Sequence, residues 1–474
     1  MSFLYFRSVK ICTAISLTLL STTVLAQEGI ELYRTYCAGC HGSQLQGGSA
    51  TTLIKTDWTY GRGKGSMIRN IRFGIPGTEM AAWNQVLSDE QIRSVTDYIV
   101  DAQDVSPQVE RPIPEQLTTE EYSLEVEEVI SEGLSYPWGI AFIDNQQALI
   151  SERNGNIRWL VNGQLDPKPI QGLPPTHTKS STGGYMDIIL DPNYNENGWV
   201  YLAYSHTNQD MTDREAPALT KIIRGKIEDY QWKEQQTLFE VPDSLMVVRG
   251  NRWGCRFLFD DEGYLYFTIG DMGKALDSQD LTKATGKVFR INPDGSIPED
   301  NPFVNEPGAL QAIYTTGNRN VQGLAQHPVT GEIWATEHGP MGGDELNILK
   351  KGANYGWPVI TYGVDYSGET VSEKTEQPGM EQPLTHWTPS IAVCPAEFVG
   401  SLQFPAWENN LLVGALAYEE LRRLVIEDNQ IVKQEMILKG VGRVRDITFG
   451  SDGSLYVLLN QPDKLLRITS REDL

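Results

Sequence analysis

The chain has 474 residues and a formal net charge of −23, because 62 acidic side chains outnumber 39 basic ones. Such a polyanion is repelled by phosphate backbones and anionic lipid surfaces, which excludes nucleic-acid binding as its main activity. Hydrophobic residues make up 40% of the chain and aromatic residues 9%, which excludes a disordered chain. The length is sufficient for several domains or for a large β architecture.

The first 26 residues have the pattern of a secretory signal peptide. Arg7 and Lys10 supply positive charge, an apolar stretch covers residues 11–20, and small residues precede a cleavage point before Gln27. The alternative is an uncleaved membrane anchor, but the apolar stretch is short for a bilayer span. We therefore expect a periplasmic protein without a membrane span once residues 1–26 are removed.

A haem-attachment motif follows the signal. Cys37, Cys40 and His41 form a C-x-x-C-H run. In such a run two thiols one helical turn apart add to the haem vinyl groups, and the histidine becomes an axial ligand of the iron. The same spacing occurs in thiol redox pairs and in half of a zinc site, but no second C-x-x-C lies nearby. The sequence therefore predicts one covalently attached haem c.

Met80 is the predicted second axial ligand of the haem. It ends a segment in which Pro76 and Gly77 disfavour a helix, so that its thioether would lie on an exposed turn. The other methionine of this stretch, Met67, lies in a predicted helix, where packing in the core is its ordinary role.

Residues 27–103 resemble a small all-α single-haem cytochrome c over their whole length. Ser88 and the acidic residues after it predict a helix start, and the helix would bury a stripe formed by Ile92, Val95, Tyr98 and Ile99. A Pro-containing acidic segment over residues 104–120 lacks periodicity and is interpreted as a linker to residues 121–474.

Beyond the linker, a pair of short apolar strands separated by a turn recurs six times. A two-sheet sandwich would not require six like units, so we predict an all-β six-bladed β-propeller. The copies are 138–142 with 149–153, 186–190 with 200–202, 256–259 with 265–268, 323–325 with 333–336, 401–404 with 411–413, and 446–449 with 455–457.

Several runs in this region carry a family resemblance. They are TIGD at 268–271, GNRNVQGL at 317–324, EHGPMGGDELN at 337–347, NYGWP at 354–358, PAWENNLLVGAL at 405–416 and GRVRD at 442–446. In order and content they resemble the soluble aldose-sugar (glucose/sorbosone) dehydrogenases that use pyrroloquinoline quinone, PQQ. The resemblance implies a dehydrogenase that oxidises an aldose sugar or a related aldehyde or alcohol and passes electrons to the fused haem.

The resemblance also implies the cofactor site. Arg319, Asn320, Arg443 and Arg445 match positions that bind PQQ, a flat tricarboxylate quinone for which fixed cations are suitable partners. Arg443 and Arg445 alternate along a predicted strand and so would share one face. The ordinary alternative for each arginine is a surface position or a structural ion pair.

A calcium site beside PQQ is implied in the same way. In the family two main-chain carbonyls hold Ca²⁺, and they correspond to Gly339 and Pro340, whose oxygen atoms suit a hard cation. Glu345 and Asp365 match further acidic calcium ligands of some members, but Gly363 breaks that pattern.

The sequence departs from the family at the catalytic centre. A histidine that takes the proton from the sugar hydroxyl is replaced by Arg252, which cannot be a good general base because guanidinium stays protonated. A family glutamine corresponds to Thr182, and a cofactor-binding lysine to Ala417. Arg252 is expected in the same cavity as the cofactor residues, bound to a PQQ carboxylate or to an anionic substrate.

Two histidines are candidates for the missing base. His206 ends a predicted strand and is the first to test, whereas His338 lies beside the proposed calcium site, where a structural role is the better interpretation.

Cys255 and Cys394 are the last two cysteines, and either a disulfide or two buried thiols is compatible with the sequence.

Two functions from different classes are compatible with these features. The first is a periplasmic quinohaemoprotein dehydrogenase with haem c, PQQ and Ca²⁺, a small sugar or aldehyde substrate and a downstream periplasmic electron carrier. The second is a propeller that has lost PQQ catalysis and serves as a binding module for the cytochrome, which Arg252, Thr182 and Ala417 would favour.

Overall fold

A computed structural model describes residues 29–42, 45, 50, 53–54, 63–75, 78, 80–104, 113–179, 182–365, 369–400 and 402–471. The chain forms two compact units, Met1–Arg111 and Pro112–Leu474. The predicted signal peptide lies outside the described residues. No helix in the described segments is both long enough and apolar enough to cross a bilayer.

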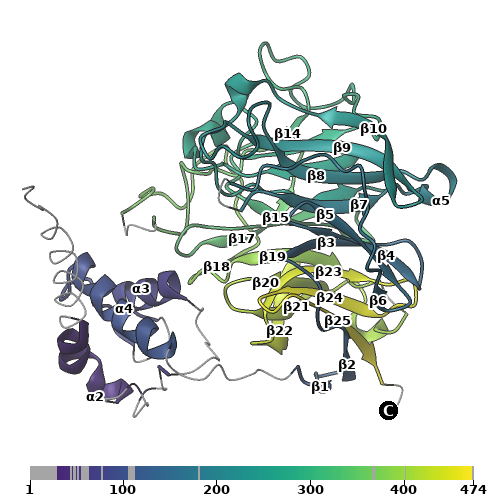
Figure 1. The fold of residues 1–474 in the computed structure, drawn as a ribbon. Helices are drawn as coiled ribbons and strands as arrows, with labels where there is room; N and C mark the ends of the chain where they lie inside the picture. The colour runs from purple at the N-terminus through teal and green to yellow at the C-terminus, as the bar shows by residue number, and fades with distance from the viewer. Residues whose placement is uncertain are drawn as a thin grey trace, which may run out of the picture. The chain divides into compact units, whose positions relative to one another are not determined.

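The first unit is helical. Its helices cover residues 29–36, α2 (Ala38–His41), α3 (Lys64–Phe73) and α4 (Asp89–Asp104) (Figure 1). The predicted start of α4 is confirmed in atomic detail, because Ser88 and Gln91 form a reciprocal capping pair. The Gln91 N–H donates to Ser88 Oγ at 3.2 Å, and the Ser88 N–H donates to Gln91 Oε1 at 3.0 Å.

The core of this unit lies where the first helix meets α4. Ile92 and Val95 are fully buried there, and the Tyr33 and Tyr98 rings lie 5.3 Å apart. Gly29 allows the close approach, since a Cβ at that position would lie 2.4 Å from the Ser94 carbonyl oxygen. The stripe predicted for α4 is therefore the face that holds the helical unit together.

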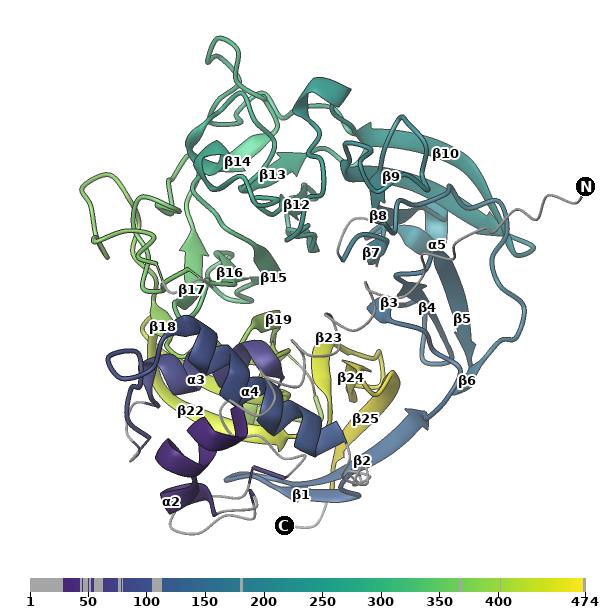
Figure 2. The same cartoon turned by 60° about the vertical axis from the view of Figure 1, so that its left-hand side comes forward.

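The second unit is a ring of six antiparallel sheets, here called blades I to VI (Figure 2), which confirms the predicted six-bladed propeller. From the centre outward, blade I contains β3 (Pro137–Phe142), β4 (Gln147–Glu152), β5 (Asn156–Val161) and β6 (Gln164–Leu165); blade II contains β7 (Tyr185–Leu190), β8 (Val200–His206), β9 (Leu219–Glu228) and β10 (Gln231–Phe239); and blade III contains β11 (Phe257–Phe259), β12 (Leu265–Ile269), β13 (Lys287–Ile291) and β14 (Ile313–Thr315).

The later blades follow the same order. Blade IV contains β15 (Val321–Gln326), β16 (Ile333–Glu337), β17 (Asp344–Leu349) and β18 (Thr385–Trp387); blade V contains β19 (Val393–Phe398), β20 (Leu411–Ala415), β21 (Glu420–Glu427) and β22 (Gln430–Lys439); and blade VI contains β23 (Arg443–Phe449), β24 (Leu455–Asn460), β25 (Lys464–Ser470), β2 (Ser123–Ile130) and β1 (Gln116–Thr118). Short helices α5 (Tyr194–Asn197), η1 (Asp243–Leu245), η2 (Ala275–Gln279) and η3 (Pro405–Trp407) lie in the loops.

Blade VI closes the ring with strands from both ends of the unit. β2 pairs with β25, with Leu124 opposite Ser470, and β1 forms a hairpin with β2. The prediction of a linker over 104–120 was therefore wrong at both margins, because Asp104 ends α4 and Gln116–Thr118 is a strand. β1 is only three residues long, too short for an alternation of polar and apolar residues to be recognised in the sequence. It forms a strand because it pairs with β2, which is itself held in blade VI by β25.

The predicted repeats correspond to the two inner strands of five blades. In blade V the first predicted strand, 401–404, was wrong, because the inner strand is β19 (Val393–Phe398). Phe404 is fully buried instead as the residue that leads into η3, where it stacks on Trp407 with ring centroids 5.2 Å apart. Pro395 and Glu397 within β19 had masked its strand pattern.

Candidate active site at the propeller axis

A cavity of about 320 Å³ lies among the innermost strands of the propeller. Five arginines line it, and no carboxylate is present among its described lining residues, although the whole chain carries a net charge of −23. The site is thus a local positive region in an acidic protein. The lining residues with charged or hydrogen-bonding side chains include Tyr136, Arg153, Thr182, Asn251, Arg252, Arg319, Asn320, Gln322, His338, Arg443, Arg445 and Asn460.

Irregular pairing of the inner strands helps to form the cavity. In blades I, II, IV, V and VI the register between the innermost strand and its neighbour shifts near the start of that strand. Such bulges re-aim side chains, and Trp138, Met186, Gln322 and Arg445, which lie within the shifted stretches, line the cavity. The backbone thus directs side chains from different blades to one place.

Arg443 and Arg445 both line the cavity, as their spacing along β23 predicted. Arg443 Nη1 donates to the Leu416 carbonyl at 3.3 Å, and Arg445 Nε donates to Asn460 Oδ1 at 3.0 Å. Burial, with a contribution from Arg445, lowers the pKa of Arg443 to about 10. Two neighbouring guanidinium groups at one cavity wall favour the binding of an anion there.

Arg319 and Asn320 reach the same cavity from blade IV. Arg319 Nη1 donates to the carbonyls of His338 at 3.1 Å and Gly339 at 2.7 Å, and its guanidinium lies 5.1 Å from the Trp357 ring centroid. Asn320 Oδ1 accepts from the Gly254 N–H at 3.1 Å, so its amide also fixes the loop that precedes β11.

Calcium at Gly339 and Pro340 stays a prediction. Neither residue lines the cavity, and the Gly339 carbonyl already accepts the hydrogen bond from Arg319. A calcium ion at 2.3–2.6 Å from that oxygen would require the guanidinium to move aside. Within the described residues, no group of three or more His, Cys, Asp or Glu side chains is arranged to hold a metal ion. The described residues fit carboxylates better than they fit calcium.

Arg252 also lines the cavity, as expected, and it is held by an ion pair with Asp271. Arg252 Nε lies 2.6 Å from Asp271 Oδ1, and Nη2 lies 3.4 Å from Oδ2. Asp271 is fully buried and also accepts from Trp357 Nε1 at 2.9 Å. Gly270 lets the two segments meet, since a Cβ there would lie 2.0 Å from the Arg252 carbonyl oxygen.

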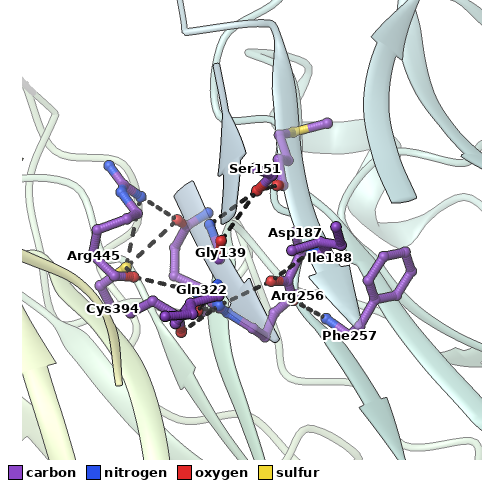
Figure 3. Close-up of polar contacts among 12 residues, drawn as sticks. Gly139, Ser151, Asp187, Ile188, Arg256, Phe257, Gln322, Cys394 and Arg445 are labelled. Carbon is purple, nitrogen blue, oxygen red and sulfur yellow. Dashed lines mark hydrogen bonds and ion pairs between the residues drawn. The ribbon is translucent and has the colours of Figure 1, made fainter. Parts of the chain in front are cut away.

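A buried charge network lies next to the cavity and joins five of the blades (Figure 3). Arg256 Nη1 contacts Asp187 Oδ1 at 3.2 Å and Asp446 Oδ1 at 2.7 Å. Its Nε donates to the Gln322 carbonyl at 3.1 Å and its Nη2 to the Arg445 carbonyl at 3.0 Å. Ser151 Oγ, on blade I, donates to the Met186 carbonyl at 2.6 Å.

Cys255 and Cys394 are free thiols, and both are fully buried. Cys394 Sγ contacts Arg445 Nη1 at 3.6 Å and donates to the Arg445 carbonyl at 3.4 Å (Figure 3). Of the two alternatives that the sequence left open, the structure therefore has the pair of buried thiols, one of which packs against a cavity arginine.

His206 does not lie among the described lining residues of the cavity. Its Nε2 contacts Asn208 Oδ1 at 3.0 Å and Glu240 Oε1 at 3.2 Å at the end of β8. His338 does line the cavity, and its Nδ1 contacts Asn320 Nδ2 at 3.2 Å. Burial and the nearby Arg319, Arg445 and Arg443 lower the pKa of His338 to about 3, which leaves its ring neutral but a weak proton acceptor.

Arg153 and Asp271 are two charged residues of the site that the sequence predictions missed. Arg153 lines the cavity from the end of β4 and lies 5.4 Å over the Tyr136 ring. Asp271 anchors Arg252. The only sequence signal for Arg153 was its place at the end of the predicted strand 149–153, whereas Asp271 stood in the TIGD run without an assigned role.

The haem-motif residues lie in the helical unit. Cys37 is the N-cap residue of α2, and the Cys40 N–H donates to the Cys37 carbonyl at 3.2 Å, so the two thiol residues are one helical turn apart. Cys37 and Met80 both pack against the same hydrophobic core, in which Met67 is 5% exposed. The candidate haem-binding residues Cys37 and Met80 thus meet at one core, in which Met67 is a packing residue.

Comparison with known proteins gives the family. Residues 134–467 match the glucose/sorbosone dehydrogenase family, and residues 24–99 match the family described as cytochrome c oxidase, cbb3-type, subunit III. The chain is 36% identical over 351 residues to aldose sugar dehydrogenase YliI of Escherichia coli, which covers 73% of this chain and 92% of that protein. It is 30% identical over 265 residues to quinoprotein glucose dehydrogenase B of Acinetobacter calcoaceticus, covering 51% and 54%.

Solved structures agree with this assignment. The crystal structure of the soluble aldose sugar dehydrogenase of Escherichia coli in the apo-form superposes with a TM-score of 0.68 at 34% sequence identity, over 73% of this chain and 100% of that chain. The chain therefore belongs to the glucose/sorbosone dehydrogenase family and carries a cytochrome c domain of the cbb3 subunit III type ahead of its propeller.

Proposed function

We propose that this protein is a periplasmic quinohaemoprotein that oxidises a sugar or related aldehyde with PQQ and passes the electrons to its own haem c. The observation that carries the proposal is the convergence of five arginines, from four blades, on one axial cavity that no described carboxylate lines. The family assignment and the quinoprotein name of one relative support the same chemistry.

The described residues fit PQQ. Its three carboxylates would be held by Arg319, Arg443 and Arg445, whose guanidinium groups contact carbonyl, amide and thiol groups at the cavity. When bound, PQQ supplies a quinone that takes two electrons from the sugar. The Trp357 ring, which is 7% exposed, lies 5.1 Å from the Arg319 guanidinium and helps to hold it in place.

The haem would be attached through Cys37 and Cys40, with His41 and Met80 as axial ligands. A thioether ligand raises the haem potential and so favours acceptance of electrons. Linking acceptor and donor in one chain raises the effective concentration of the haem at the quinone. The periplasmic location follows from the predicted signal over residues 1–26 and from the compartment in which c-type haem is attached, and a downstream carrier would reoxidise the haem.

The test uses the purified full-length protein with its haem. PQQ is added with and without Ca²⁺, its binding is measured by calorimetry, and aldose-dependent reduction is followed in the haem absorption band. The Arg443→Met variant should bind PQQ on the order of 10- to 100-fold more weakly, since hydrogen bonds between charged groups contribute roughly 1.5–3 kcal/mol. Arg422→Met, on β21 and outside the cavity, is the matched control.

The alternative function, a binding module for the cytochrome, predicts the opposite result in this test. A propeller that serves only as a binding module would bind no PQQ, and no aldose would reduce the haem with or without Ca²⁺. That result would refute the dehydrogenase. Haem reduction that needs both PQQ and sugar would support it, and dependence on Ca²⁺ would support the metal site at Gly339 and Pro340.

A further inference from the structure

We propose that the sugar oxidised at this site carries a carboxylate, and that Arg252 is the residue that selects it. This inference rests on the proposed function, because it names the substrate class of the same cavity. It is argued from the fixed position of Arg252 and from the charge of the described lining residues.

Arg252 is a pre-organised cation at the cavity wall. Asp271 fixes one edge of its guanidinium through Nε and Nη2, and Asp271 is fixed in turn by the Trp357 indole and the Gly273 N–H. The side chain of Arg252 is still 24% exposed, so the rest of the guanidinium remains available in the cavity. An arginine held in this way loses little further entropy when it binds an anion.

The charge of the site favours an anionic substrate. Five arginines line the cavity, and no carboxylate is present among its described lining residues. Asp271 contacts Nε and Nη2 of Arg252, and the remaining N–H groups of the guanidinium can bind a carboxylate through short, charge-assisted hydrogen bonds. A neutral aldose would offer these groups only weaker hydrogen bonds.

The surroundings of Arg252 suit the rest of a carbohydrate. Asn251 lies beside it in the chain, and Thr182 lines the same cavity from the segment before β7. Amide and hydroxyl groups are the partners that sugar hydroxyls use, so a ring can bind by its hydroxyls while its carboxylate meets Arg252. The predicted substrate class is an aldose acid, such as a hexuronate.

Glucuronate and glucose test the inference, because they differ only in the carboxylate at carbon 6. With the PQQ-loaded full-length protein, glucuronate should show at least a tenfold lower KM in haem reduction and at least tenfold tighter binding by calorimetry. The preference should shrink at high salt. Arg252→Met should abolish it, Arg252→Lys should keep part of it, and Arg249→Met should keep all of it. Arg249 lies three residues earlier, is 59% exposed and pairs with Glu215.

The outcomes separate the two proposals. If both sugars reduce the haem with equal KM, the enzyme stands and the carboxylate inference is overturned. If Arg252→Met weakens PQQ binding and leaves the glucuronate preference intact, Arg252 belongs to the cofactor and the inference is overturned. Tighter binding of glucose 6-phosphate than of glucuronate would reject the carboxylate. If no sugar reduces the haem, the dehydrogenase fails, while calorimetry with glucuronate still shows whether Arg252 binds a sugar acid.

Discussion

Arg252 and Asp271 form a two-contact ion pair at the cavity wall, with Nε 2.6 Å from Oδ1 and Nη2 3.4 Å from Oδ2. Arg252 has a φ of 60°, a region that side-chain-bearing residues seldom adopt, and the ion pair helps to hold it there. The sequence resemblance predicts that Arg252 replaces a histidine that accepts the sugar proton. On that prediction, a permanent cation stands in place of a titratable base.

Replacement of Arg252 by histidine should raise the oxidation of neutral aldoses. Asp271 would remain as an acceptor that orients the imidazole, and an imidazole can take up a proton near neutral pH whereas a guanidinium cannot. General base catalysis contributes at least about 100-fold. The measurement is the initial rate of haem reduction at saturating glucose with PQQ, with Arg252→Gln as a neutral variant that offers no base. Equal rates for the His and Gln variants would contradict the prediction.

Met80→Ala should lower the reduction potential of the haem, whereas Met67→Ala should lower only the stability of the helical unit. Loss of the thioether should lower the reduction potential on the order of 100 mV, since axial ligands set haem potentials over a wide range. Met67 is 5% exposed in the core, so its truncation should lower the free energy of unfolding by about 2–5 kcal/mol. Potentiometry and urea unfolding measure the two effects. An unchanged potential and low-spin spectrum in Met80→Ala would show that another group is the ligand.

The features that the sequence predicted well depend on neighbours in the chain. The start of α4 follows from Ser88 and Gln91, which are three residues apart, and the inner strands of five blades follow from local alternation. Arg443 and Arg445 could be assigned to one face because they are two residues apart on a strand.

The features that were missed depend on contacts between distant segments. β1 is a strand because blade VI closes on it, and β19 pairs as an inner strand in spite of Pro395 and Glu397. Arg153 reaches the cavity from the end of β4, where its Nε donates to the Gly183 carbonyl at 3.2 Å, a contact between segments that no local pattern reports. His206 was considered as the base from its place at a strand end, but Glu240 and Asn208 bind it there.

Arg256→Met should destabilise the propeller strongly. Its guanidinium is buried and contacts Asp187 and Asp446, and removal of one partner of a buried ion pair costs about 3–5 kcal/mol. Urea unfolding followed by tryptophan fluorescence measures the loss. Lys350→Met, which breaks an exposed pair with Glu381, should cost less than about 1 kcal/mol.

A companion variant tests whether the unpaired carboxylates are the cause. Asparagine at positions 187 and 446 retains an oxygen for the N–H groups of Phe257 and Ile140 but carries no charge. Adding Asp187→Asn and Asp446→Asn to Arg256→Met should therefore restore part of the lost stability. A triple variant that is no more stable than Arg256→Met would mean that packing, rather than charge, explains the effect.

The propeller should become less stable as the pH rises, because the buried carboxyl group of Glu397 then loses its proton. Burial, followed by the charge of Asp446, raises the pKa of this β19 carboxyl to about 8, while Arg256 acts in the opposite direction. Because the folded state holds the proton more tightly than the unfolded chain, the contribution of Glu397 is complete below pH 4.5 and is lost as the pH rises through 8. Between these values the free energy of unfolding should fall by at most about 1.4 kcal/mol per pH unit. Glu397→Gln has no titrating group there, so urea unfolding at pH 5, 7 and 9 should show a smaller fall in the variant, and parallel curves for the two proteins would refute the raised pKa.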